Sequence, residues 1–253
     1  MHANNNMKKE SRQRKWIIPT VIVVLIVCGF FIYVEQYYRA DSIAAAALIS
    51  DENVQISHTD YGWIFDGESE EDALIFYPGG KVEAAAYAPL CRELAQNGAD
   101  VCLVEMPLRL AMFGMNKADS IIDALDYEHW YIAGHSLGGV FAAYYAAENE
   151  EKLDGIILLA SYSTKELRDL KAILIYGSED KVLNMKEYAK NRTNVTADSI
   201  EHIIDGGNHA QFGSYGLQAG DGTALVSPQE QIDETVMAVE GIFRESKQSR
   251  GNN

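Results

Sequence analysis

The segment from His129 to Ala147, HWYIAGHSLGGVFAAYYAA, restricts the possible folds of this chain more than any other. A strand-like run leads into the short turn Gly134–Gly138, and an alanine-rich helix follows at once. Only glycines fit near the serine of so tight a turn, because the backbone there approaches itself closely. The pattern predicts that Ser136 stands exposed at the head of a helix, between a strand and the helix that covers the sheet.

The rest of the chain continues this alternation of strands and helices. Strands are expected at residues 54–58, 61–65, 73–77, 100–106, 129–134, 155–161, 172–178 and 199–205, and helices at 83–96, 117–125, 137–149, 185–191 and 228–245. Apolar strands between helices indicate a mostly parallel sheet that is covered on both faces. We therefore expect an α/β fold with eight strands. Residues 161–171 are too few for a large cap domain, so its cleft should be open.

A run of nineteen uncharged residues, Trp16–Val34, is long enough to cross a membrane. Basic residues precede the run, which predicts that the N-terminus stays in the cytoplasm and that the rest of the chain faces outward. A cleaved signal peptide, giving a secreted protein, is the main alternative, with Ala44–Ala47 as the nearest cluster of small residues. Lipid modification of Cys28 is a weaker one.

These features predict a division of the chain into five parts. They are a basic cytoplasmic tail (1–15), a transmembrane signal anchor (16–38), a connector without chemistry (39–52), a catalytic domain (53–246) and a disordered tail (247–253). The sequence does not determine the oligomeric state.

Composition excludes several classes of function. The formal net charge of −16 argues against a nucleic-acid partner, since binding phosphates requires a basic surface. The histidines and the three cysteines show no spacing that would suit a metal ion, so we expect neither a metal nor another cofactor. Cys91 and Cys102 are expected to be free, buried thiols.

A serine hydroxyl becomes a nucleophile when an imidazole removes its proton and a carboxylate holds that imidazole in place. In strand–turn–helix elbows of this kind the acid and then the histidine follow the serine along the chain, each after a later strand. Asp180, in AILIYGSEDKV, and His209, in HIIDGGNHAQFG, stand at such positions. The alternatives are Asp205 for the acid, and His135 or His202 for the base.

Two backbone amides should stabilise the oxyanion that forms during acyl transfer. One belongs to Leu137, directly after the serine. The other should follow the third strand, where FYPGGKV places Gly80, with Lys81 as the second choice. A plain glycine turn without a catalytic part is the alternative.

The motifs FYPGGKV, EMPLRLAMF, GHSLGG, YGSEDKV and GGNHAQFGSYG together resemble the single-domain bacterial hydrolases grouped as α/β-hydrolase fold-5. The resemblance covers roughly residues 53–245. It implies a triad of Ser136, Asp180 and His209, with Gly80 and Leu137 as oxyanion donors, and an esterase-like activity on a small ester or acyl substrate.

The substrate itself stays open, because the same elbow serves many hydrolases. The chain is expected to be a membrane-anchored serine esterase, with an amide or thioester as other substrates of the same triad. A non-catalytic module that binds a ligand or partner on the same scaffold is the other hypothesis. The loops 107–116 and 211–226 are apolar-rich and are expected either to line the substrate site or simply to pack.

Overall fold

The computed structural model describes the backbone of residues 2–67 and 69–250 and the side chains of residues 16–67 and 69–243. The chain divides into two compact units, residues 1–37 and residues 38–253.

The first unit is one long helix, α1 (His2–Glu35). Its stretch Trp16–Glu35 is long and apolar enough to cross a membrane. Membrane anchors and signal sequences share this length and composition, so the apolar helix is confirmed while its role stays a prediction. The helix also includes most of the expected N-terminal tail; Met1 lies outside the described residues.

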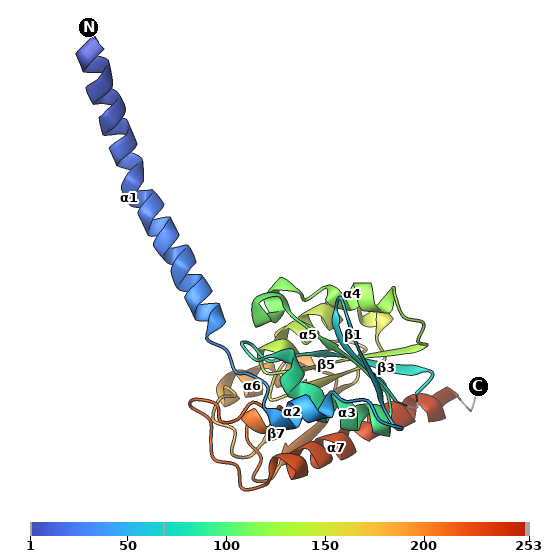
Figure 1. The fold of residues 1–253 in the computed structure, drawn as a ribbon. Coiled ribbons are helices and arrows are strands. Elements are labelled where there is room, and N and C mark those ends of the chain that lie inside the picture. Colours follow the sequence, from blue (N-terminus) through green and yellow to red (C-terminus); the bar gives the residue numbers. More distant parts are fainter. Residues whose placement is uncertain (1, 68, 251–253) are drawn as a thin grey trace. The chain divides into compact units, whose positions relative to one another are not determined.

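The second unit is built on one eight-stranded sheet (Figure 1). Its strands are β1 (Gln55–Thr59), β2 (Gly62–Asp66), β3 (Asp72–Tyr77), β4 (Asp100–Val104), β5 (His129–His135), β6 (Gly155–Leu159), β7 (Ala172–Gly177) and β8 (Ile200–Ile204). They lie in the order β1-β2-β4-β3-β5-β6-β7-β8. β2 pairs antiparallel with β1 and with β4, and all other neighbouring strands pair parallel. The expected α/β-hydrolase fold is confirmed.

Six helices of this unit follow in chain order. They are α2 (Ser42–Ala47), α3 (Ala88–Asn97), α4 (Lys117–Ile122), α5 (Leu137–Glu148), α6 (Met185–Asn191) and α7 (Pro228–Arg250). Residues 247–250, expected in a disordered tail, continue α7, and residues 251–253 lie outside the described part of the chain. The connection from β6 to β7 contains bends but no helix.

The sheet separates two hydrophobic cores, because successive side chains of a strand point to opposite faces. In β3, Leu74 and Phe76 pack with α3 and α7, whereas Ile75 and Tyr77 pack with α4 and α5. Figure 1 shows α3 and α7 together on one side of the sheet and α4 and α5 on the other. Burial on both faces explains why these strands are apolar without alternation.

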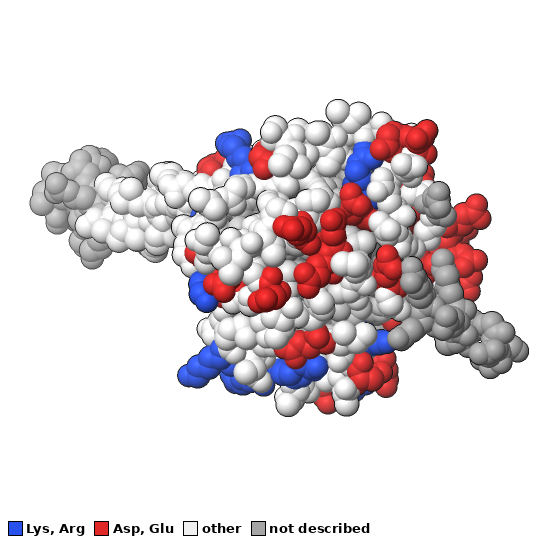
Figure 2. Space-filling view, turned by 90° about the horizontal axis from the view of Figure 1, so that it is seen from below, with Lys and Arg blue, Asp and Glu red and all other residues white. Residues whose placement is uncertain are grey.

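The surface carries the negative charge of the chain. Figure 2 shows acidic side chains spread over the face seen from below, with basic ones gathered near its edge. An acidic face of this kind repels phosphate backbones. The expectation that the chain binds no nucleic acid stays a prediction.

The residues expected as a connector (39–52) pack against this unit, and so does Tyr38, which was expected to end the transmembrane anchor. The apolar helix ends earlier, at Glu35. Tyr38 forms a parallel bridge with Val82, and α2 contacts α3. Arg92 of α3 donates to the carbonyl of Ala47 (3.0 Å) and pairs with Asp51 (2.7 Å). Residues 38–52 are thus tied to the fold by backbone and side-chain bonds.

The turn between β5 and α5 generates a stability prediction. A Cβ on Gly134 would lie 2.6 Å from the backbone of Gly138 and Gly139, so Gly134→Ala should lower the free energy of unfolding by about 1–3 kcal/mol or more. Gly241→Ala in α7 is the control, because its Cβ meets no atom within 4 Å and should add roughly 0.5–1 kcal/mol. Thermal unfolding of the full chain in detergent checks both; equal stabilities would contradict the prediction.

Candidate active site

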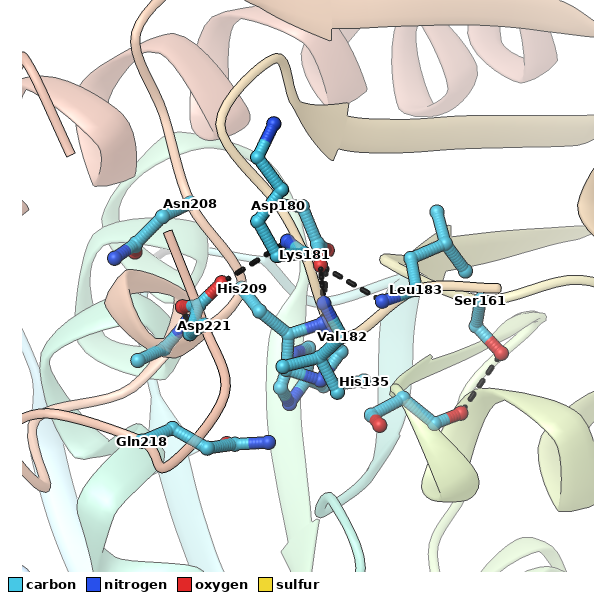
Figure 3. Close-up of polar contacts among 12 residues, drawn as sticks. His135, Ser161, Asp180, Lys181, Val182, Leu183, Asn208, His209, Gln218 and Asp221 are labelled. Atoms are coloured by element: carbon cyan, nitrogen blue, oxygen red, sulfur yellow. Dashed lines mark hydrogen bonds and ion pairs between the residues drawn. The ribbon is translucent and has the colours of Figure 1, made fainter. Parts of the chain in front are cut away.

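Ser136 lies at the point where β5 ends and α5 begins. Its backbone adopts φ 53° and ψ −124°, which side chains other than glycine rarely adopt. The Ser136 amide donates to the carbonyl of Leu159 (2.9 Å), and the Ser161 hydroxyl donates to the carbonyl of Ser136 (2.8 Å; Figure 3). These bonds to β6 and to the residues after it hold the turn in its strained conformation.

Asp180 and His209 form a buried pair. Asp180 follows β7, His209 follows β8, and Oδ2 of the carboxylate lies 2.8 Å from Nδ1 of the imidazole. Both side chains are 1% exposed. The other carboxylate oxygen, Oδ1, accepts the backbone amides of Val182 and Leu183, each at 2.8 Å (Figure 3). A carboxylate bound on both oxygens can hold the imidazole in one orientation, with the proton on Nδ1.

The opposite nitrogen of this histidine is available for chemistry. Nε2 of His209 is buried and has no hydrogen-bond partner among the described residues. His209 and Ser136 line the same cavity, of about 210 Å³, together with Leu137, Val140, Ala160, Ser161, Tyr162, Val182, Leu183 and Asn184. Bonds between a nucleophile and its base are often long before substrate binds.

The other candidates for acid and base are engaged elsewhere. Asp205 accepts the hydroxyl of Ser178 (3.4 Å), and His202 pairs with Glu234 on α7 (2.8 Å). His135 contacts Tyr87 through Nδ1. The structure therefore brings together Ser136, Asp180 and His209.

The loop after β3 lies against the elbow. A Cβ on Gly80 would lie 2.7 Å from the side chain of Leu137, so this backbone approaches closely only because residue 80 is a glycine. The amide of Lys81 donates to the carbonyl of Arg109 (2.8 Å). Among the described residues, neither the Gly80 nor the Leu137 amide donates a hydrogen bond. The Leu137 amide directly follows Ser136, and the Gly80 loop packs against the Leu137 side chain. Because the Lys81 amide is already bonded, Gly80 is the better candidate of the two, and its role as an oxyanion donor stays a prediction.

Tyr87, which the sequence analysis did not single out, connects this loop to the elbow. Its hydroxyl accepts the amide of Gly79 (3.0 Å) and lies 2.7 Å from Nδ1 of His135. Because the oxygen accepts from Gly79, its own proton is available for His135. Burial lowers the pKa of His135 well below its usual value, and the nearby His209 lowers it further, so His135 stays neutral. Burial raises the pKa of Tyr87, which keeps its proton.

Asp221 ties the two loops of the acid–histidine pair together. Its Oδ2 accepts the amide of Ala210 (2.9 Å), next to His209, and its Oδ1 accepts the amide of Lys181 (3.3 Å), next to Asp180 (Figure 3). No sequence motif marks Asp221, because its partners lie far from it along the chain.

The two apolar loops do not line the cavity at Ser136. Its walls come from the elbow, from the residues after β6 and from those after Asp180. Residues 112–117 line a separate cavity of about 360 Å³ with Ser120. Among the described residues, no group of three or more His, Cys, Asp or Glu side chains could hold a metal ion.

Comparison with known proteins agrees with the fold. A family model described as the alpha/beta hydrolase family matches residues 73–233. A search of curated proteins gives no match.

Solved structures show the same architecture at low identity. A predicted CIB-like hydrolase from Thermoplasma acidophilum is 17% identical, with 74% of this chain and 98% of that chain covered and a TM-score of 0.56. A membrane phospholipase A is 12% identical, with 90% and 99% covered and a TM-score of 0.56. An esterase from Mycobacterium tuberculosis is 12% identical, with 78% and 95% covered and a TM-score of 0.54. At these identities the likeness concerns the fold alone.

Tyr87 generates a prediction about turnover. Tyr87→Phe removes the hydroxyl that joins Gly79 to His135, so the neighbouring Gly80 amide should lose its orientation. We expect kcat on an activated ester to fall roughly 10- to 100-fold with little change in KM, since a displacement of about 1 Å costs this much. Tyr145→Phe is the matched control, because its hydroxyl bonds Asp119 (2.8 Å) away from the loop. Equal kcat for the two variants would contradict a positioning role of Tyr87.

Proposed function

We propose, from the premise that this chain belongs to the alpha/beta hydrolase family, that it is a serine hydrolase that cleaves carboxylic ester bonds. The observation that carries this proposal is the buried bond between Asp180 and His209, whose free Nε2 lines one cavity with Ser136. Acyl transfer needs this combination of nucleophile, base and orienting carboxylate.

The reaction proceeds in two halves. His209 Nε2 takes the hydroxyl proton of Ser136 as Oγ attacks the carbonyl carbon, and the Gly80 and Leu137 amides donate to the oxyanion. The tetrahedral intermediate collapses when His209 returns the proton to the departing alcohol, which leaves an acyl-enzyme. Water then gives a proton to His209 and attacks this ester. His209 passes that proton to Oγ of Ser136 as the acid departs, which restores the free enzyme. Asp180 keeps the Nδ1 proton in place throughout.

The size of the cavity favours a small acyl or leaving group. Pockets for drug-sized ligands measure roughly 300–1,000 Å³, and the space beside Ser136 is about 210 Å³. Its walls include Val140, Val182 and Leu183, which suit an apolar group. The same machinery would cleave a thioester or an amide, so these remain the second candidates.

Covalent labelling tests the nucleophile. A fluorophosphonate probe should label the full chain, and Ser136→Ala should abolish labelling and lower ester turnover by at least roughly 10⁴-fold. Ser120→Ala on α4 is the control, because this exposed serine lies outside the cavity at Ser136. A folded wild-type chain that never labels and turns over no activated ester would favour a non-catalytic binding module. A panel of p-nitrophenyl esters, thioesters and anilides of increasing acyl length identifies the substrate class.

We further propose that α1 anchors the enzyme in a membrane with the catalytic unit outside. The support is the apolar length of residues 16–35 and the five basic residues that precede it, Lys8, Lys9, Arg12, Arg14 and Lys15.

Topology reporters test this orientation. A fusion of alkaline phosphatase after Asn253 should be active, because the C-terminus lies outside, whereas a β-galactosidase fusion at the same place should be inactive. The opposite pair of results would overturn the orientation and leave the hydrolase proposal intact.

A further inference from the structure

The backbone of Tyr38 pairs with the loop that carries Gly80. Its amide donates to the carbonyl of Lys81 (2.8 Å), and its carbonyl accepts the amide of Glu83 (2.9 Å). This short parallel bridge to Val82 is formed by the residue that stands three positions after the end of α1. Tyr38 is therefore bonded directly to the loop that carries Gly80.

The bond matters because Lys81 is strained. Its φ of 59° lies in the left-handed region, which costs a residue with a side chain roughly 1–2 kcal/mol. The amide of Lys81 is held by Arg109 and its carbonyl by Tyr38. Strained residues persist only where their surroundings fix them, and this one directly follows the amide of Gly80.

The side chain of Tyr38 reaches the loop on the other side of the site. Its hydroxyl accepts the amide of Ala219 (3.1 Å), and its ring lies 5.5 Å from that of Tyr215. The Asp41 amide donates to the carbonyl of Ser214 (2.9 Å). Ala219 stands two residues before Asp221, which binds the backbone beside both His209 and Asp180.

Further bonds keep this segment on the domain. The Ala40 amide donates to Oε2 of Glu83 (3.0 Å). The carboxylate of Asp41 accepts the amides of Ile43 (2.9 Å) and Ala44 (3.0 Å), which caps the first turn of α2. Ala44 is fully buried. The segment is thus fastened at both ends.

We propose that Tyr38–Asp41, the segment that directly follows the apolar helix, is a positioning element of the active site, which fastens the oxyanion loop to the loop that carries His209. The proposal rests on the hydrolase function proposed above. Tyr38 was expected to end the transmembrane anchor and residues 39–41 to begin a connector without chemistry. The proposal gives both a part in fixing the Gly80 amide.

A consequence concerns processing of the chain. Ala44–Ala47 is the cluster of small residues at which a signal peptidase could cleave. Cleavage there would separate Tyr38 from the domain and lower the activity of the enzyme. Ala44 is buried within α2, whereas Ala45 and Ala46 are exposed, so the bonds of Tyr38–Asp41 carry this consequence. The uncleaved, helix-bearing chain is therefore the active form.

The test compares variants of the full chain in detergent. Tyr38→Ala should lower kcat roughly 10-fold and weaken binding of a trifluoromethyl ketone, a mimic of the tetrahedral intermediate, by the same factor, with KM unchanged. Tyr38→Phe removes only the hydroxyl and should lower kcat about 3-fold. Tyr61→Phe is the matched control, because this half-buried tyrosine lies in the turn between β1 and β2. It should leave kcat and inhibitor affinity unchanged.

The outcomes separate this proposal from the function on which it rests. Wild-type kcat and inhibitor affinity in both Tyr38 variants, with the wild-type chain still labelled by fluorophosphonate, would overturn the positioning role alone. An unlabelled wild-type chain would instead overturn the hydrolase function. Tyr38→Ala could also lower the stability of the chain, in which case Tyr38→Phe decides. A 3-fold lower kcat in Tyr38→Phe at unchanged melting temperature supports the proposal, and an unchanged kcat overturns it.

The position of the N-terminus in the labelled protein gives an independent test of the proposal. Fluorophosphonate-labelled protein recovered from cells should begin before Tyr38, as read by mass spectrometry. A labelled species that begins after Asp41 and reacts at the wild-type rate would overturn the proposal.

Discussion

The geometry of the site depends on the turn that carries Ser136 from β5 into α5. The serine accepts a left-handed φ because β6 holds its amide and Ser161 holds its carbonyl. Glycines on either side leave room for the backbone, since a Cβ on Gly138 would lie 2.2 Å from the carbonyl oxygen of Tyr77. Once this turn is formed, the Leu137 amide points out of the start of α5, and the adjacent strands deliver the loops that surround it.

Those loops are also bonded to one another. Tyr87 links the loop after β3 to the elbow, and Asp221 links the loops after β7 and β8. Tyr38 links the loop after β3 to the one that holds Asp221. Loops on a rigid sheet keep their own mobility, so cross-bonds of this kind determine how well donors and base stay aligned. The described connection from β6 to β7 contains no helix that could cover the site, so these bonds between loops take on more of the task of keeping the site aligned.

Much of this molecule could be predicted from its sequence, because the signals were local. Apolar runs between helices gave the parallel sheet, and a glycine-flanked serine between a strand and a helix gave the elbow. Asp180 and His209 stood after the expected strands, and the structure brings them together. The hydrogen bonds between the loops could not be predicted from the sequence, because their partners lie far apart along the chain. Tyr38 and Ala219 are 181 positions apart, and tyrosines after an apolar helix read more simply as membrane-interface residues.

Backbone strain points to the same edge of the sheet without reference to any motif. In the described part of the chain, the non-glycine residues with positive φ are Lys81, Leu108, Arg109, Ser136 and Ala160. All of them follow the carboxyl ends of four strands, β3, β4, β5 and β6. Each costs about 1–2 kcal/mol, so a fold selected for stability alone would not gather them in one place. Lys81 and Arg109 are bonded to each other, and Tyr38 holds the far side of Lys81. The segment after the apolar helix thus holds one of the strained residues at the edge of the sheet where Ser136 lies. This is why we assign the segment to the active site and not to the connector.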